Sequence, residues 1–451
     1  MRNWKIIRRY EQLPDLPILA QVDVLVAGGG PAGVAAAETA AIAGKSTYLI
    51  EKYGFCGGAA VAGLSGTICG MYMATDDVTA PPEQVVFGFT ERFRQSLADN
   101  NGVTPPQRYG KTFTVTHDPL VWREVADEML TNAGVNILYH TAVSGVIMDG
   151  DLFKGVVIES NAGQSIILAN IIIDASGDAA VIARAGLETY FGDEGRIQNP
   201  TMFFRVAGVD MDQYLEYYGM DTICPPKVTE NILKANKELG WELPRHKIWI
   251  FPTTRPGELM VNATRLAGQD GRMLNVIDPV DFTEAEVLGR RQVRAYAKFL
   301  NEFVPGCESA YVVDTGVEVG IRQTRSIKGV KTLTNEDVVN CRKQEDGICR
   351  TPWPIELHSG NKPKLHWLLN DYYDIPFGTL VPKVGENIIV AGRCLSAEHE
   401  ALASARVTAQ CFELGHAAGV AAIQAIDTQT PIRDLNVADI RATMIANGSA
   451  L

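Results

Sequence analysis

The chain has 451 residues, of which 46% are hydrophobic and 21% are charged. This length exceeds what one hydrophobic core normally serves, so we expect two domains. The net charge of −12 argues against a nucleic-acid partner, because such a partner requires a concentrated basic surface.

The 8 cysteines form no C-x-x-C pair, so neither a zinc site nor an iron–sulfur cluster is expected, and no metal ligand is predicted. Free thiols in a reducing compartment are the natural interpretation for a chain of this size. The sequence shows no apolar run of membrane-spanning length and no signal-peptide stretch. We therefore expect a soluble, cytoplasmic protein, and a homo-oligomer is compatible with the sequence.

The first elements in chain order form a β–α–β unit. A short buried strand is predicted over 21–27, an alanine-rich helix over 31–43 with Gly44 as its C-terminal cap, and a second strand over 46–50. Further elements of the same style follow: a helix over 120–133, a strand over 135–139, a meander of strands over 155–159 and 165–168, and a β-branched strand over 171–173.

The texture of the sequence changes between 199 and 371, where Pro, Trp, Tyr and Arg are frequent and regular βα alternation stops. After this region a strand is predicted over 387–391, followed by a long helix of small residues that ends near Ile426. We expect a discontinuous α/β domain, 1–198 and 372–451, with a Rossmann-like fold of the glutathione-reductase type. An inserted α+β substrate domain is expected at 199–371.

A glycine motif marks the turn between the first strand and the first helix. Gly28 permits a tight turn, Gly30 lets the backbone approach a pyrophosphate, and Gly33 lets helix and strand pack closely. The helix N-terminus offers free N–H groups to the phosphates. Glu51 follows the second strand, where a carboxylate accepts both ribose hydroxyls. The motif in this register predicts a dinucleotide site.

Two other segments favour FAD over NAD. Residues 171–178 resemble the second strand-and-glycine contact of two-dinucleotide-domain flavoproteins, and residues 390–394 resemble the turn that passes beside a flavin ring. The sequence has one complete dinucleotide fingerprint, whereas a pyridine-nucleotide disulfide reductase shows two.

Several segments are more distinctive than the glycines: Cys56-Gly57-Gly58, residues 318–325, residues 355–358, residues 373–376, and residues 392–406. With the motifs above, they resemble the FAD-dependent oxidoreductases related to the flavoprotein subunits of fumarate reductase and succinate dehydrogenase. The resemblance runs nearly end to end and implies FAD as cofactor.

The motifs and the resemblance together predict these FAD contacts: Gly28, Gly30, Pro31, Ala32, Gly33, Glu51, Lys52, Cys56, Gly57, Gly58, Val143, Ala175, Ser176, Gly177, Asp178, Gly392, Arg393 and Ala405. Cys56 is compatible with a covalent flavin link or with a buried inert thiol. The small residues of the last long helix predict close packing on the first helix, with the helix N-terminus directed at the flavin.

Hydride exchange with a flavin requires a proton donor or acceptor and a cation for any carboxylate or oxyanion. We expect His399, Arg406 and Arg322 to act in catalysis, the role of Arg406 being implied by the resemblance. Arg325, His358 and Tyr373 are candidates for substrate binding. Arg322 and Arg325 share one face if their segment is helical.

The sequence therefore predicts a flavin dehydrogenase or reductase that exchanges a hydride between N5 and a small polar organic molecule. Its second partner would be a diffusible electron acceptor such as oxygen, a quinone or a redox protein. A flavin monooxygenase or oxidase that uses O2 is the alternative. An RNA-modifying flavoprotein and a redox sensor without turnover remain open as other classes.

Overall fold

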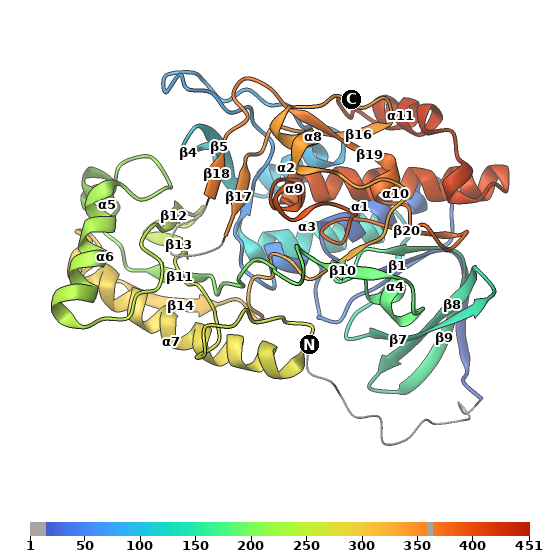
Figure 1. Cartoon of the computed structure of the whole chain (residues 1–451), viewed down its shortest axis with the longest axis horizontal. Coiled ribbons are helices and arrows are strands. Elements are labelled where there is room, and N and C mark those ends of the chain that lie inside the picture. The colour runs from blue at the N-terminus through green and yellow to red at the C-terminus, as the bar shows by residue number, and fades with distance from the viewer. Residues whose placement is uncertain (1–14, 359–363) are drawn as a thin grey trace.

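The computed structural model describes residues 15–358 and 364–451 (Figure 1). The first 14 residues of the predicted cofactor domain and residues 359–363 of the predicted substrate domain lie outside the described part. Across the described residues, none of the helices combines the length and the apolar character that crossing a membrane requires.

A seven-stranded sheet forms the centre of the larger part of the molecule, on the right in Figure 1. Its strands run in the order β6-β2-β1-β9-β8-β7, and β20 also pairs with β9. The strands are β1 Ile18–Ala27, β2 Thr47–Ile50, β6 Asn136–Leu138, β7 Ala142–Asp149, β8 Leu152–Ser160, β9 Gly163–Asp174 and β20 Ile388–Val390.

Parallel pairing joins β6, β2, β1, β9 and β20. This arrangement confirms the predicted α/β fold with a Rossmann-like unit. The separate strands predicted over 165–168 and 171–173 are one continuous strand, β9. Its residues 163–168 pair antiparallel with β8, while residues 172–174 pair parallel with β20. The sequence did not predict β7, which completes the meander.

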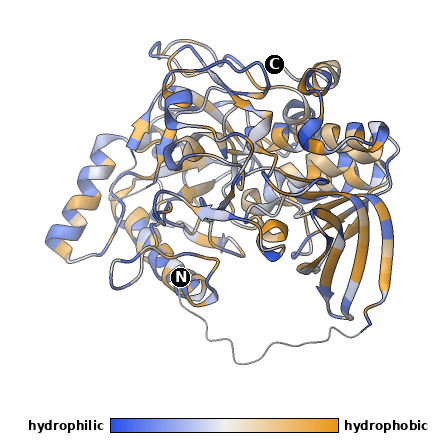
Figure 2. Cartoon of the chain, turned by 45° about the vertical axis from the view of Figure 1, so that its right-hand side comes forward, coloured by the Kyte–Doolittle hydropathy of each residue, from blue (hydrophilic) through white to orange (hydrophobic). Residues whose placement is uncertain are grey.

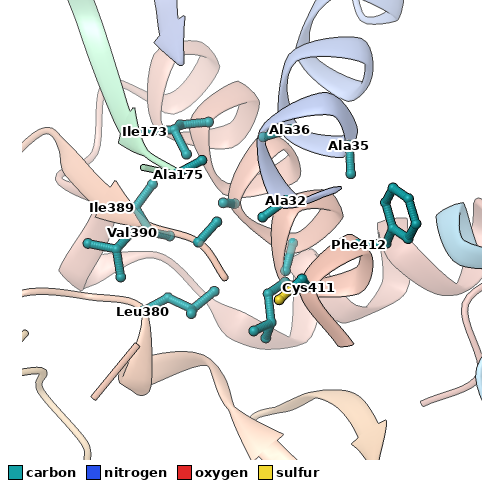
Figure 3. Close-up of a cluster of buried hydrophobic side chains, with 14 of the residues drawn as sticks. Ala32, Ala35, Ala36, Ile173, Ala175, Leu380, Ile389, Val390, Cys411 and Phe412 are labelled. Carbon is teal, nitrogen blue, oxygen red and sulfur yellow. The ribbon is translucent and has the colours of Figure 1, made fainter. Parts of the chain in front are cut away.

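Helices cover this sheet, and the two that matter most for the site are α1 (Pro31–Ile42) and α10 (Thr408–Thr428). Figure 3 shows Ala32, Ala35 and Ala36 of α1 against the start of α10, beside strand residues such as Ile173 and Val390. The predicted contact between the two small-residue helices is confirmed. The other helices of this part are α2 Phe89–Asp99, α3 Pro119–Asn132, α4 Ala180–Arg184, α8 Asn335–Val339, α9 His399–Ala405 and α11 Val437–Ala446.

A second hydrophobic core lies in the smaller part of the molecule, on the left in Figure 1. Its antiparallel sheet runs in the order β12-β13-β11-β14. Figure 2 shows mixed hydrophilic and hydrophobic colour on its helices, as expected when one helix face is buried and the other meets water. The elements are β11 Phe204–Ala207, β12 Trp249–Pro252, β13 Glu258–Asn262, β14 Tyr311–Thr315, α5 Met211–Tyr218, α6 Pro226–Leu239 and α7 Pro279–Phe303.

Short sheets complete the structure. They consist of β3 Thr67–Ile68 with β5 Thr112–Thr116 and β4 Gln107–Tyr109, β10 Thr189–Phe191 with β15 Arg325–Ile327, β16 Gly347–Thr351 with β19 Tyr373–Pro376, and β17 Ile355–Leu357 with β18 Lys364–His366. The buried side chains of the second core end at Ile321, whereas Ile327, Ile348 and Ile355 belong to the first core. The return to the cofactor part therefore begins well before residue 372 in terms of packing.

Candidate active site

A cavity runs along the carboxyl ends of the parallel strands. The loops that line it follow β1, β2, β9 and β20 and include Gly28, Glu51, Ala175 and Gly392. We call this region the cofactor end of the cavity. Ligands of open parallel sheets bind at this edge, where the strand order changes direction.

Two glycines of the motif after β1, Gly28 and Gly33, have no room for a side chain. Gly28 has a φ of +105°, and a Cβ there would lie 2.6 Å from the carbonyl oxygen of Ala175. A Cβ at Gly33 would lie 1.8 Å from the carbonyl oxygen of Gly28. Gly30 differs, because a Cβ there would meet only the Cα of Gly58, at 3.9 Å. The space in front of Gly30, at the N-terminus of α1, is therefore free for a ligand.

Glu51 closes the cofactor end at the tip of β2, with 5% of its surface exposed. Its carboxylate oxygens accept hydrogen bonds from the backbone N–H groups of Gly29, at 2.7 Å, and Tyr53, at 2.9 Å. Burial raises the pKa of Glu51, and these two N–H groups oppose the shift. A carboxylate held in this way retains lone pairs for two ribose hydroxyls.

An ion pair stands beside the glycine turn. Arg393, after β20, donates to Asp178 at 2.8 Å, and the hydroxyl of Thr324 donates to the same carboxylate at 2.7 Å. Burial raises the pKa of Asp178, but Arg393 and Thr324 outweigh burial, so the pKa lies below its usual value. The pair joins β9, β20 and the segment that leaves the second core.

The other half of the cavity, which we call the arginine end, is lined by Arg322, Arg406, His358 and Glu356. Arg322 donates to the backbone oxygen of Asn199 at 3.1 Å, and Arg406 donates to the side-chain oxygen of Gln198 at 3.1 Å. Burial lowers the pKa of Arg406 to about 10 and that of Arg322 well below its usual value. Both guanidinium groups stay charged, because arginine does not lose its proton in proteins, and both lie in a poorly solvated site.

A buried chain of polar side chains backs the arginine end. Tyr109 donates to Oε1 of Glu356 at 2.7 Å, and Nε2 of His358 lies 3.6 Å from the same oxygen. Behind His358, Arg245 hydrogen-bonds Nδ1 of the imidazole and donates to Asn262 at 2.9 Å. Because a guanidinium can only donate, Nδ1 accepts and the proton of neutral His358 resides on Nε2.

Aromatic side chains form a wall of the arginine end. Tyr109 packs against Trp353 and Phe251, with ring centroids 5.1 and 6.2 Å apart, and Phe203 also lines the cavity. These residues belong to a small cluster between the two main cores. An apolar wall with a few charged groups is the usual composition of a small-molecule site.

A model of the FAD dependent oxidoreductase family matches residues 23–444. The chain belongs to this family. FAD is accordingly its cofactor, and the residues at the cofactor end fit this group. The glycine turn leaves space at a helix N-terminus, and a buried carboxylate stands where an adenosine ribose requires an acceptor.

Among individual proteins, the digeranylgeranylglycerophospholipid reductase of Methanoculleus marisnigri is 30% identical over 169 residues, which span 37% of this chain and 42% of that protein. The urocanate reductase of Eggerthella lenta is 48% identical over 58 residues, 12% of this chain and 9% of that protein. The chain thus matches less than half of the length of either relative. A geranylgeranyl bacteriochlorophyll reductase-like structure from Thermoplasma acidophilum has 17% identity and a TM-score of 0.48, covering 95% of this chain and 82% of that one.

Most of the residues predicted to contact FAD line the cavity. They are Gly28, Gly30, Pro31, Ala32, Glu51, Lys52, Gly58, Ala175, Ser176, Gly177, Asp178, Gly392 and Arg393. Gly33, Cys56, Gly57, Val143 and Ala405 do not line it. Gly33 instead allows helix α1 to pack closely on the glycine turn. Cys56 lies behind the turn, with its sulfur 2.7 Å from where a Cβ of Gly29 would be. Burial raises the pKa of the Cys56 thiol.

The predicted catalytic and substrate residues divide into two groups. Arg322, Arg406 and His358 meet at the arginine end, whereas His399, Arg325 and Tyr373 do not line the cavity. His399 begins α9, and Tyr373 donates to Ser404 at 2.9 Å within the first core. Arg322 and Arg325 do not share one helix face, since their segment is not helical. Arg322 lies in a loop and Arg325 lies in β15.

Sequence reasoning missed Tyr109, Arg245, Glu356 and Trp353 as site residues. Glu356 had a usable signal, because it precedes His358 by two positions at strand β17 and residues two apart share a face. Tyr109 and Arg245 belong to segments without a motif. The packing of the two cores brings Tyr109 to the cavity and Arg245 to His358 behind it.

Proposed function

We propose that this protein is a flavin-dependent dehydrogenase or reductase that exchanges a hydride between N5 of FAD and a small polar organic substrate. The observation that supports this proposal is one continuous cavity whose cofactor end carries a glycine turn and Glu51 and whose arginine end carries buried cations. Bound FAD supplies the two-electron chemistry, and the protein supplies binding, orientation and electrostatics.

At the cofactor end, the N–H groups at the start of α1 would meet the pyrophosphate in front of Gly30, and Glu51 would accept the ribose hydroxyls. Arg393 lines the same region and adds positive charge. Thr408 at the N-terminus of α10 also lines the cavity, so the dipole of this long helix favours negative charge there.

At the arginine end, Arg322 and Arg406 would bind and orient a substrate with negative or strongly polar groups. Phe203, Phe251 and Trp353 line the same cavity and would exclude water from the space beside a bound substrate. Exclusion of water strengthens each of these electrostatic contacts, because the local dielectric is low. A diffusible electron acceptor would complete the cycle.

The proposal includes kinship with the fumarate reductase and succinate dehydrogenase flavoproteins. The segments that suggested this kinship contribute Arg322, Glu356, His358 and Arg406 to the cavity. The short match to a urocanate reductase bears on this kinship.

The test is an anaerobic metabolite screen that follows the absorbance of the bound, oxidised flavin. We expect at least one small polar compound to bleach the flavin, and Arg406→Gln to slow bleaching at least a hundredfold while FAD remains bound. Arg184→Gln, an exposed arginine outside the cavity, should bleach at the parent rate. A product that gains an oxygen atom from O2 would support the monooxygenase instead. Equal bleaching rates in all three proteins would refute the assignment of the arginine end.

A further inference from the structure

The arginine end contains more buried positive than negative charge. Arg322 and Arg406 line this end, 6% exposed and half-buried, and Arg245, 4% exposed, lies directly behind it on His358. Glu356 is the single carboxylate beside them among the described cavity residues. The other acidic residues of the cavity that form ion pairs, Asp178 and Glu318, are neutralised by Arg393 and Lys52 at the cofactor end.

Such an excess of buried charge is unfavourable unless a ligand compensates it, because a charge loses its hydration on burial. Repulsion from Arg245 and Arg406 adds to burial in lowering the pKa of Arg322. Among the described residues, Arg322 and Arg406 donate hydrogen bonds to neutral groups, and Nε of Arg406 is buried without a partner. These cations therefore retain donors for an anionic group.

Glu356 complements the arginines, because it accepts hydrogen bonds where they donate them. Its Oε1 is occupied by Tyr109 and faces the N–H of His358, whereas the described residues provide no hydrogen-bond donor to Oε2. Burial raises the pKa of Glu356, but the contact with His358, the hydrogen bond from Tyr109 and the charge of Arg245 outweigh burial, so the pKa lies below its usual value. The carboxylate is therefore ionised at neutral pH and can only accept hydrogen bonds.

We propose that the substrate is an organic acid that also carries a hydroxyl or amino group, with its carboxylate bound by Arg322 and Arg406 and its O–H or N–H donating to Oε2 of Glu356. This inference rests on the proposed function and narrows its substrate class. A simple carboxylic acid would satisfy the arginines and leave Glu356 without a donor. A neutral alcohol would satisfy Glu356 and leave the buried cations uncompensated.

The first experiment measures dissociation constants from the change in flavin absorbance of the holoenzyme. The probes are acids of two to six carbons and aryl acids, each as the 2-hydroxy acid, the 2-amino acid, the unsubstituted acid and the methyl ester of the 2-hydroxy acid. We expect the preferred hydroxy or amino acid to bind ten- to a hundredfold more tightly than the unsubstituted acid, as for a hydrogen bond to a charged group. The ester should bind at least a hundredfold more weakly. Comparison of the 2-hydroxy acid with the 2-amino acid shows whether a hydroxyl or an amino group of the substrate donates to Glu356.

Two variants locate the donor contact. In Glu356→Gln the amide places an N–H group where Oε2 was, so the preference for the hydroxy or amino acid should disappear while the unsubstituted acid still binds. Tyr109→Phe removes a hydroxyl from the same network but leaves Oε2 available, so the preference should persist. Glu124→Gln, at an exposed position of α3, controls for the general loss of a carboxylate.

Three results would overturn the inference: unsubstituted acids or esters that bind as tightly as hydroxy and amino acids, an unchanged preference in Glu356→Gln, or no binding by any acid of the panel. Bleaching of the flavin by a compound without a carboxylate would leave the proposed oxidoreductase function standing and refute this substrate class. The absence of bleaching by every compound tested would instead count against the function itself.

Discussion

Gly415 of α10 lies directly against the backbone of Ala32 in α1, so closely that a Cβ at position 415 would come within 2.0 Å of the Ala32 carbonyl oxygen. Ala32 also lines the cofactor end of the cavity. The packing of these two helices therefore determines where the N-terminus of α1, and with it the predicted pyrophosphate site, is held relative to α10.

Gly415→Ala should consequently destabilise the protein. Backbone atoms cannot move aside as a flexible side chain can, and overpacking of this kind typically costs about 1–3 kcal/mol. Gly419→Ala is the matched comparison, because its Cβ would lie 2.9 Å from the Ala36 carbonyl oxygen and from a Thr39 carbon. We expect a smaller loss there, partly offset by the roughly 1 kcal/mol of helix propensity that alanine gains over glycine. Denaturant unfolding followed by circular dichroism measures both, and equal stability of Gly415→Ala and the parent would contradict the packing argument.

Gly30 and Gly33 should respond differently to the same substitution. A Cβ at Gly30 meets only Gly58, at 3.9 Å, but points into the space assigned to the pyrophosphate. Gly30→Ala should therefore fold with the stability of the parent apoprotein and bind FAD at least a hundredfold more weakly. Gly33→Ala should lose folded protein even without FAD, because its Cβ would overlap the Gly28 carbonyl. Thermal melts without cofactor and FAD titration separate these effects, and a Gly30→Ala protein with parental FAD affinity would disprove the assigned position.

The first β–α–β unit was predicted to within a few residues, because its glycines, its alanine-rich helix and Glu51 each have a local physical signature. The division of β9 into two strands was wrong for a tertiary reason. Its polar Asn170 interrupts the apolar pattern, yet β1 pairs with β9 on both sides of this residue, from Ile166 to Asp174. A strand that changes partners from β8 to β20 has no single hydrophobic period to recognise.

The site was predicted only in part, again because tertiary contacts decide which side chains reach it. Arg406 follows a recognisable turn-and-helix segment, whereas Tyr109 and Glu356 are 247 residues apart and meet only through the packing of the two cores. His399 has a suitable side chain near the expected region, but α9 places it away from the cavity. A residue type near a motif indicates a region of the fold, and the side-chain direction depends on contacts made elsewhere.

His117 should make stability depend on pH. Its ring is 1% exposed and packs on Trp122 with centroids 4.4 Å apart, and burial lowers its pKa to about 4. Because the unfolded value is about 6.5, the unfolded chain binds the extra proton between pH 6.5 and pH 4. The contribution of neutral His117 is complete above pH 6.5 and is lost as the pH falls through this window, by up to about 3 kcal/mol.

Urea unfolding of His117→Phe between pH 7 and pH 4 tests this linkage. The variant should lose less stability than the parent over this interval, and the exposed His366→Phe should follow the parent curve. Parallel curves for His117→Phe and the parent would show that the imidazole does not titrate in the way its burial requires. His358, whose pKa is also lowered by burial, contributes equally in all three proteins.

The Asp178–Arg393 pair should couple stability to FAD affinity. Arg393→Met leaves the carboxylate of Asp178 without its adjacent cation, and loss of one partner of a buried pair costs about 3–5 kcal/mol. The side chains here are 26% and 14% exposed, so we expect a smaller loss of about 2 kcal/mol at pH 7. Asp178→Asn in the same chain should restore much of this stability, because the uncompensated charge is then absent.

FAD affinity should remain reduced in the double variant, since Arg393 lines the cofactor end. Unfolding of the four apoproteins, together with FAD titrations, completes the cycle. Full recovery of FAD affinity in the double variant would show that Arg393 acts only through Asp178.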